Sequence, residues 1–321
     1  MKPRISVCIP SYNHARYVAN TLRSVLRQSI GSLEVVIVDD SSSDDSVARI
    51  REIDDPRVRL IVNEHNLGPG ATVNRAIAES AGEYITFIGS DDEMFPDALA
   101  RRCAILDTDS RIGLVYSDAA IIDADSKPLG RYWASEGYVP LRGRLSLAML
   151  ASTGLFIPAI SVLVRKSCLV QAGPMDASLR YAHDGDLWLR LAALAPIEFV
   201  DDALVGWRKH GLNLHQTLDP EGYAERSVVI ARILAANPRA APWWTHRGLI
   251  ANPLLQAVEI AFRRDPNEAR KYLMLAFRHC PYHPLLPLLY LNTFLDLPAL
   301  WDIGIFKRLL LRLVNPDRKS A

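Results

Sequence analysis

The stretch Tyr84–Asp92, with the sequence YITFIGSDD, decides the fold class of this chain. Its apolar, β-branched and aromatic start predicts a buried strand, and the carboxylates of Asp91 and Asp92 follow at the end of that strand. Open α/β sheets bind their ligands at this edge. Two adjacent acids repel each other and lose hydration there unless a cation or ligand hydroxyls compensate them. The alternative is a solvated acidic turn, since aspartate also favours turns.

The segments on either side of this stretch repeat the order of a strand followed by a helix. Apolar runs predict further strands at residues 5–9, 33–38, 58–62, 113–116, 160–164, 199–200 and 204–207. Helical spacing of apolar residues predicts helices at residues 18–26, 47–50, 71–78, 96–106, 167–172 and 184–193. Residues 119–129 indicate a hairpin or an excursion. Short loops between nearly continuous apolar strands predict an α/β fold with a mainly parallel, doubly wound sheet.

The pattern changes in the last third of the chain. Beyond about residue 215 the apolar residues recur only with helical spacing, and prolines such as Pro238 and Pro266 cut this pattern into pieces. We therefore expect two domains, a sheet-containing domain over residues 1–214 and an all-helical C-terminal extension over residues 215–321.

Charge and cysteine content exclude several classes of protein. The formal net charge is +1, which gives no general preference for nucleic acid. The cysteines stand far apart, without the spacing of metal ligands: Cys8, Cys103, Cys168 and Cys280. This spacing argues against a zinc site and fits a reducing compartment. The first four residues lead directly into a strand pattern without an apolar signal segment, and no long apolar run predicts a membrane span. We expect a cytoplasmic location.

Four segments occur in a fixed order: Val7–Asn13, Val36–Ser42, Gly82–Asp92 and His183–Trp188. As an ordered set over residues 4–212 they resemble the inverting glycosyltransferases of family 2, which have the GT-A fold. The resemblance implies a nucleotide-sugar donor of the UDP or dTDP type, a divalent metal (Mn²⁺ or Mg²⁺) and inversion at the anomeric carbon. It makes residues 1–214 the expected catalytic domain.

The resemblance implies a donor-binding role for eight positions: Pro10, Tyr12, Asn13, Asp40, Asn66, Gly68, Asn74 and Asp91. A ring at Tyr12 can cover a nucleobase, and a carboxylate at Asp40 can accept hydrogen bonds from a base or ribose. A glycine at position 68 lets the backbone approach a ligand closely. Structural alternatives stand beside these roles: turn chemistry, helix capping and helix entry.

The resemblance assigns Asp91 to the ribose, and Asp92 and His210 to the metal. The more common family pattern is Asp-x-Asp-Asp, whereas Gly89 occupies the place of the first acid in this chain. Fewer carboxylates predict a weaker metal site that depends on the diphosphate. Arg208 or Lys209 can offset charge on the leaving group.

Asp184 is the catalytic base that the resemblance implies. In the family a Glu-Asp pair begins a helix and its Asp deprotonates the acceptor hydroxyl, whereas here His183 replaces the Glu. A carboxylate at this position must be partly desolvated or held close to the acceptor to act as a base. A plain helix cap is the alternative.

These assignments predict an inverting transfer of a sugar to a hydroxyl of a saccharide or lipid-linked saccharide, in bacterial surface-polysaccharide or lipopolysaccharide synthesis, with no nucleic-acid partner. A non-catalytic GT-A scaffold or partner-binding protein is one alternative, supported by Gly89 and His183. A sugar nucleotidyltransferase is another, but residues 10–14 lack the Gly-rich, basic loop that holds a triphosphate.

The C-terminal segment, residues 285–321, is rich in leucine and ends in basic residues. From Trp301 onward its apolar residues can share one helical stripe, with Arg308 and Arg312 one turn apart elsewhere. Two interpretations remain open. The segment can lie in the headgroup region of the inner membrane face, beside a lipid-linked acceptor, or it can pack on the catalytic domain or across a homodimer.

Overall fold

The computed structural model describes residues 2–132, 140–145, 157–211, 220–236 and 265–279, with isolated helical positions at 254, 257–258, 286–287 and 290. The chain divides into two compact units, residues 1–216 and residues 217–321. All the candidate site residues of the sequence analysis lie in the first unit.

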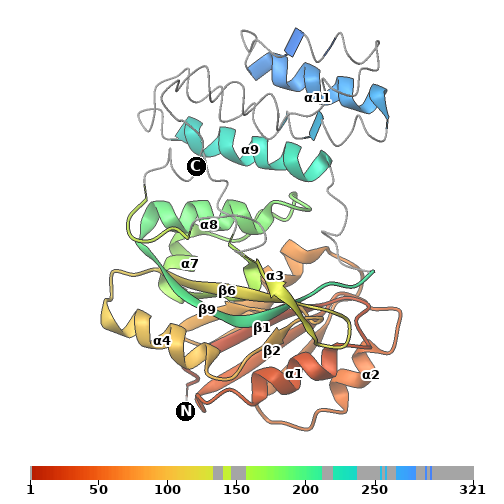
Figure 1. Ribbon diagram of the computed structural model, residues 1–321. Helices are drawn as coiled ribbons and strands as arrows, with labels where there is room; N and C mark the ends of the chain where they lie inside the picture. Colours follow the sequence, from red (N-terminus) through yellow and green to blue (C-terminus); the bar gives the residue numbers. More distant parts are fainter. Residues whose placement is uncertain are drawn as a thin grey trace. The chain divides into compact units, whose positions relative to one another are not determined.

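One nine-stranded sheet forms the centre of the first unit (Figure 1). Its strands are β1 (Ile5–Ser11), β2 (Leu33–Asp39), β3 (Val58–Val62), β4 (Tyr84–Phe87), β5 (Glu93–Met94), β6 (Leu114–Ile122), β7 (Pro128–Arg131), β8 (Val162–Arg165) and β9 (Ile197–Arg208). Their spatial order is β3-β2-β1-β4-β8-β6-β9-β5, and β7 pairs with β6.

The first four strands of this order, β3-β2-β1-β4, pair in parallel. The next strand, β8, runs antiparallel to both of its neighbours, whereas β6 and β9 again form a parallel pair. Parallel strands end at the same edge of a sheet, so the loops after β1, β2 and β4 lie side by side. The predicted α/β fold is confirmed. Strand β4, which begins the YITFIGSDD stretch, is the last strand of the parallel part of the sheet.

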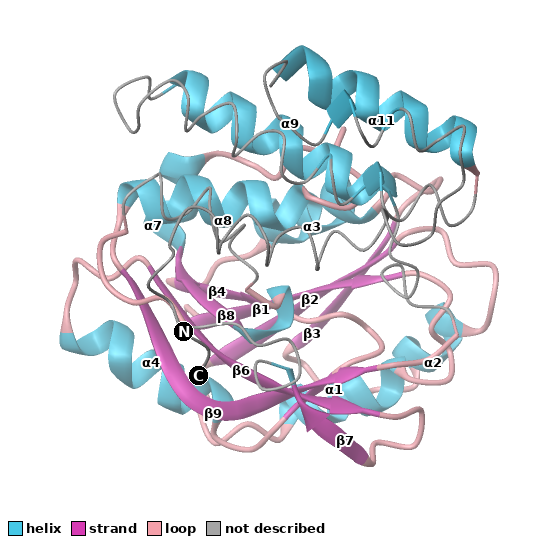
Figure 2. Ribbon diagram, turned by 45° about the horizontal axis from the view of Figure 1, so that its top comes forward, coloured by secondary structure: helices cyan, strands magenta, loops and turns pink. Residues whose placement is uncertain are grey.

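Helices cover both faces of the sheet, as expected for a doubly wound fold (Figures 1 and 2). One face carries α1 (Val18–Leu26), α2 (Ser46–Arg51) and α4 (Ala98–Thr108). The other face carries α3 (Pro69–Glu79), α7 (Lys166–Ala172) and α8 (His183–Leu194), and a short 3₁₀ turn, η1 (Ala159–Ser161), precedes β8.

Apolar burial on each face anchors the helices that carry the site. On one face Val18, Leu22 and Val25 of α1 are fully buried in the core around β1. On the other face Trp188 of α8 is fully buried, and its ring centroid lies 5.9 Å from that of Phe87 at the end of β4. Each such side chain contributes about 1.5–3 kcal/mol on burial, which holds both helices at the edge where β4 ends.

The described residues of the second unit are helical. They include α9 (Pro220–Ala236) and α11 (Pro266–His279), with a separate core that contains Ala269, Tyr272, Leu273 and Ala276 of α11. No described helix is both long and apolar enough to cross a membrane. Residues 291–321, including the predicted stripe from Trp301, lie outside the described residues.

Candidate active site at the carboxyl edge of the sheet

The turn between β4 and β5 holds Asp91 and Asp92 in a buried position. The Thr21 hydroxyl of α1 lies 3.0 Å from the carbonyl oxygen of Ser90 and 2.7 Å from that of Asp92. The two acids are only 8% and 4% exposed, respectively. The solvated acidic turn, one of the two interpretations of the sequence, is therefore excluded by burial.

Strand β9 brings two more polar side chains to the acids. Antiparallel pairing places Glu93 of β5 opposite Gly206 of β9. The residues just beyond this pair then meet the turn. His210 Nε2 lies 2.9 Å from Asp91 Oδ2, and the backbone N–H of Arg208 donates to Asp92 Oδ1 at 2.9 Å.

The Arg208 guanidinium lies behind the acids, with only 1% of its side chain exposed. Its Nε donates to the carbonyl oxygen of Asp91 at 2.7 Å, its Nη2 pairs with Glu93, and its Cζ lies 5.1 Å from the ring centroid of Tyr17. The neighbouring Lys209 places its Nζ over the Trp207 ring. Arg208 therefore holds the turn in place, and a role of Arg208 or Lys209 in offsetting leaving-group charge stays a prediction.

His14, which the sequence analysis did not single out, completes the cluster. Its Nδ1 lies 2.8 Å from Ser90 Oγ and 3.7 Å from Asp91 Oδ1, and its ring meets that of His210 edge-on at 5.6 Å. One ligand atom from each of His14, Asp91 and His210 lies within 4.8 Å of the others. The only signal in the sequence was a histidine shortly after the first strand.

The two adjacent acids have pKa values shifted in opposite directions. Burial raises the pKa of Asp91, but the hydrogen bond from His210 and the charges of His14 and His210 outweigh it and hold this pKa below its usual value. Burial raises the pKa of Asp92 well above its usual value, and the negative charge of Asp91 adds to the increase. Burial also lowers the pKa of His14, so its imidazole is mainly neutral at pH 7.

This donor set fits a divalent cation. A carboxylate and two imidazoles are ligands of Mn²⁺ and similar ions, and the ionised Asp91 supplies the charge. Asp92, which the sequence analysis assigned to the metal, uses Oδ1 to accept the Arg208 N–H. The structure groups Asp91 with His210, and the metal role of Asp92 stays a prediction.

Gly89 lies beneath both carboxylates. A Cβ atom at this position would lie 2.6 Å from Asp91 Oδ1 and 2.7 Å from Asp92 Oδ2, closer than side chains normally approach. The two acids thus converge on the place where the common family pattern carries its first acid. In this arrangement a side chain at position 89 has no room.

Asp40 organises the loop before α3. Its side chain is 3% exposed, and it accepts hydrogen bonds from Asn63 Nδ2 at 2.6 Å and from the N–H groups of Leu67 and Gly68 at 2.9 Å. Asn66 Oδ1 also accepts from the Gly68 N–H, at 3.1 Å. Three predicted donor residues therefore form one hydrogen-bonded loop, and their contact with a nucleotide stays a prediction.

The loop after β1 supplies the other predicted donor residues, which continue from Pro10 at the end of the strand. Asn13, with a positive φ of 55°, receives a hydrogen bond at Oδ1 from the Ser43 N–H and donates its own N–H to Ser42 Oγ. These bonds join the loops after β1 and β2. Tyr12 remains 47% exposed, so it is accessible to a ligand.

Asn74 and Asp184 lie on the helices of the other face. The Asn74 amide is bonded at both ends to the backbone of Met175, with two distances of 2.8 Å, so it ties α3 to the segment before α8. Asp184 is in the first turn of α8, half-buried, with Oδ1 accepting the Gly185 N–H at 2.7 Å. Because Trp188 lies one turn further along α8 and packs on Phe87, the base candidate and the acidic turn are both anchored to β4.

Comparison with known proteins identifies the family. Residues 6–157 match the profile of Glycosyl transferase family 2. This part of the chain belongs to glycosyl transferase family 2. The chain is 27% identical over 209 residues to an uncharacterized glycosyltransferase of Rickettsia felis, covering 65% of this chain and 34% of the relative. It is 29% identical over 216 residues to chondroitin synthase of Escherichia coli, covering 66% of this chain and 30% of the relative.

The chain thus spans about a third of the length of these two relatives. Among solved structures, it is similar to Staphylococcus aureus TarS 1–349 in complex with UDP-GlcNAc, with a TM-score of 0.64, 17% identity, and 91% of this chain and 89% of that chain covered. It is also similar to a mannosyltransferase of Pyrobaculum calidifontis in complex with GDP-Man and Mn²⁺, with a TM-score of 0.54, 16% identity, and coverage of 96% and 88%. The predicted GT-A fold is confirmed.

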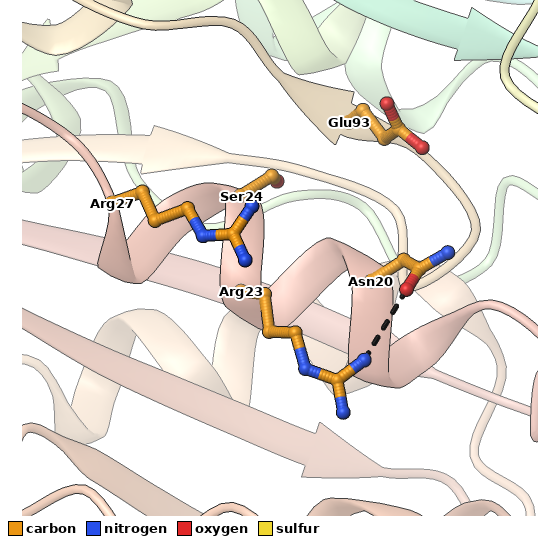
Figure 3. Close-up of a pocket in the computed structure, with 5 residues that line it drawn as sticks. All are labelled: Asn20, Arg23, Ser24, Arg27 and Glu93. Atoms are coloured by element: carbon orange, nitrogen blue, oxygen red, sulfur yellow. Dashed lines mark hydrogen bonds between the residues drawn. The ribbon is translucent and has the colours of Figure 1, made fainter.

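A cavity of about 410 Å³ has none of the predicted site residues in its lining. It is lined by Asn20, Arg23, Ser24, Arg27 and Glu93 (Figure 3). Arg23 of α1 and Arg27, which follows the last residue of α1, are exposed, and Arg23 bonds to Asn20 within α1. Glu93 is shared with the Arg208 network behind the acids.

Proposed function

We propose that the chain is an inverting, metal-dependent glycosyltransferase that moves a sugar from a UDP- or dTDP-sugar to a hydroxyl of a saccharide or lipid-linked saccharide. The observation that carries the proposal is the buried Asp91 at the carboxyl edge of β4, facing the imidazoles of His14 and His210. A buried carboxylate with two imidazoles at a ligand-binding sheet edge is typical of a site for a metal–diphosphate group.

On the donor side, residues of several loops have separate tasks. Tyr12, with its exposed ring, would stack on the nucleobase, and Asp40 would present the loop at Gly68 to the base and ribose. A divalent cation held by Asp91 and His210 would neutralise charge on the diphosphate as it leaves. The buried Arg208 would keep Asp91 and His210 close together, because it donates to the carbonyl oxygen of Asp91 and precedes His210 by two residues.

On the acceptor side, Asp184 would take the proton. The acceptor hydroxyl passes its proton to the Asp184 carboxylate while its oxygen forms a bond to the anomeric carbon. The bond from that carbon to the phosphate oxygen breaks, and the nucleoside diphosphate leaves with the electron pair. Attack opposite the leaving group inverts the configuration. Among the described residues, no hydrogen bond reaches Asp184 Oδ2, so this oxygen is available for a hydroxyl.

The relatives support the type of reaction. Chondroitin synthase is a polysaccharide-forming enzyme by its name, and the similar solved structures hold UDP-GlcNAc in one case and GDP-Man with Mn²⁺ in the other. We propose from this that the chain acts in polysaccharide synthesis with a nucleotide-sugar donor.

The test combines a donor screen with the substitution Asp184→Asn. The unaltered chain is expected to bind and slowly hydrolyse a member of a panel of UDP- and dTDP-sugars in the presence of Mn²⁺ or Mg²⁺. Asp184→Asn should bind the same donor with unchanged affinity but lose about 10²–10⁴-fold in transfer rate, the usual contribution of a general base. Asp54→Asn, at an exposed position, is the control.

Two outcomes would contradict the proposal. If calorimetry detects no binding of any donor and no nucleoside diphosphate is released, the glycosyltransferase assignment fails. If Asp184→Asn transfers sugar as fast as Asp54→Asn, the assignment of the base fails.

A further inference from the structure

The chain lacks the first strand-end acid of the common family pattern, and in the same turn region one ligand atom from each of His14, Asp91 and His210 lies within 4.8 Å of the others. A Cβ at Gly89 would contact the ends of both carboxylate side chains, so these side chains would have to move to admit any larger residue. His14 approaches from the loop after β1, a different strand, and its Nδ1 is 3.7 Å from Asp91 Oδ1.

We propose that His14 is a metal ligand, which forms with Asp91 and His210 a site of two imidazoles and one carboxylate and gives this enzyme a preference for Mn²⁺, Co²⁺ or Zn²⁺ over Mg²⁺. The inference rests on the proposed function for its role in catalysis, although the site itself can be tested without activity.

The geometry matches one shared cation. His210 Nε2 lies 2.9 Å from Asp91 Oδ2, whereas His14 faces the other carboxylate oxygen, Oδ1. Neighbouring ligands of an octahedral ion with bonds of about 2.1 Å stand about 3 Å apart, and opposite ligands about 4.2 Å apart. The three ligand atoms lie within 4.8 Å of one another, so small side-chain rotations bring them onto one ion.

Both imidazoles are held in place by the protein. The ring of His210 stacks on Tyr17, with 4.7 Å between centroids and an angle of 27°. The His14 ring is held by Ser90 Oγ, 2.8 Å from Nδ1, an interaction that a bound cation would replace. The His14 backbone is fixed as well: its N–H donates to Ser46 Oγ at 2.9 Å, and its carbonyl oxygen accepts from the N–H groups of Tyr17 and Val18. The His14 side chain is 18% exposed and that of His210 only 4%. Such fixed positions are expected of ligands and are unusual for surface histidines.

The choice of ion follows from the ligand atoms. Mg²⁺ prefers oxygen ligands and strict octahedral geometry, whereas imidazole nitrogen suits later divalent metals of the first transition row. A site of two imidazoles and one carboxylate therefore favours nitrogen-preferring ions and carries less negative charge than a site built from several carboxylates.

The test measures metal binding directly on the full chain. We expect Co²⁺, added in the presence of UDP, to bind with a visible absorption spectrum and more tightly than Mg²⁺ in calorimetry. His14→Ala should weaken Co²⁺ binding at least tenfold and alter the spectrum. His14→Asp, which supplies oxygen instead of nitrogen, should lower the ratio of Co²⁺ to Mg²⁺ affinity at least tenfold. His65→Ala, an exposed histidine, is the control.

The proposal is overturned if His14→Ala binds Co²⁺ with unchanged affinity and spectrum, or if the unaltered chain binds no Co²⁺ with UDP present. It is also overturned if His14→Ala weakens UDP binding equally with and without metal, because His14 would then contact phosphate. Failure of the proposed function is distinct: metal binding through His14 would persist in a chain that transfers no sugar.

Discussion

The substitution Gly89→Ala tests whether the crowding beneath the two acids is functional. The added Cβ would lie 2.6 Å from Asp91 Oδ1 and 2.7 Å from Asp92 Oδ2, whereas ordinary contacts begin at 3.4 Å. The two oxygens must therefore move by about 0.8 Å and 0.7 Å. These atoms are the ends of side chains, so rotation can relieve the contact. Rotation, however, disturbs the hydrogen bonds of Asp91 with His210 and of Asp92 with Arg208.

We expect a larger effect on activity than on stability. A displacement near 1 Å in a catalytic group costs about 10²-fold in rate, so transfer should fall by about 10- to 100-fold, or about 1.4–2.7 kcal/mol in the barrier. Weakening of the two hydrogen bonds should lower the free energy of unfolding by only about 1–2 kcal/mol. Gly89→Asp should be at least as inactive, although it restores the common family motif, since its Cβ has the same contacts and its charge adds repulsion.

The assay compares single-turnover transfer, metal affinity and urea denaturation for these variants. Gly31→Ala is the matched control, because a Cβ there meets no atom within 4 Å and the backbone is not left-handed. The reasoning is refuted if Gly89→Ala transfers sugar as fast as Gly31→Ala, or if Gly89→Asp binds metal more tightly than the unaltered chain.

Two further predictions concern the framework. Asn74→Ala should lower the free energy of unfolding, measured by urea denaturation, by about 1–3 kcal/mol, because it leaves the buried N–H and C=O of Met175 unpaired. Unchanged stability together with weaker donor binding would contradict this and support a contact between Asn74 and the donor. Burial raises the pKa of Asp107, but hydrogen bonds from Arg4 and Tyr84 outweigh it and leave the pKa below its usual value. This carboxylate therefore stabilises the fold above the unfolded-state pKa of about 3.9, and its contribution is lost as the pH falls through the lower folded-state value. Since the side chain is 40% exposed, Asp107→Asn should lower the free energy of unfolding by less than about 1 kcal/mol at pH 7. The variant should also lose less stability than the unaltered chain as the pH falls below about 4. An unchanged pH dependence of the free energy of unfolding in this range would contradict the prediction.

The regular elements of the sheet domain could be predicted because their own residues determine them. The buried side chains of α1 recur at helical spacing, and β2 is an almost unbroken apolar run. Strand β5 escaped prediction because it has only two residues, Glu93 and Met94, and exists through pairing with β9. Strand β9 was predicted as two pieces, since the polar Asp201-Asp202 pair interrupts its pattern. It is one strand because β6 pairs with it on both sides of irregularities around Asp118.

The site was predictable to the extent that its residues follow strand ends. Asp91, Asp92 and His210 lie in motifs and could be proposed together. His14 could not, because its role depends on how the loop after β1 folds back against Ser90 and His210, which no periodicity encodes. For the same reason the sequence could not show that Asn74 is bonded to the backbone of Met175, far along the chain.

The different surroundings of Asp91 and Asp92 show why adjacency in sequence does not determine role. Both acids lie in the same turn, held from α1 by the Thr21 hydroxyl. Asp91 faces two imidazoles, which favour its charged form. For Asp92, burial and the repulsion of its neighbour outweigh the backbone hydrogen bonds at Arg208 and Gly89, so its neutral form is favoured. The imidazoles come from the loops after β1 and β9, and the pairing of β5 with the end of β9 brings the second loop to the acidic turn. Strand pairing at the edge of the sheet therefore makes Asp91 the stronger candidate for a cation ligand, while the metal role of Asp92 stays a prediction.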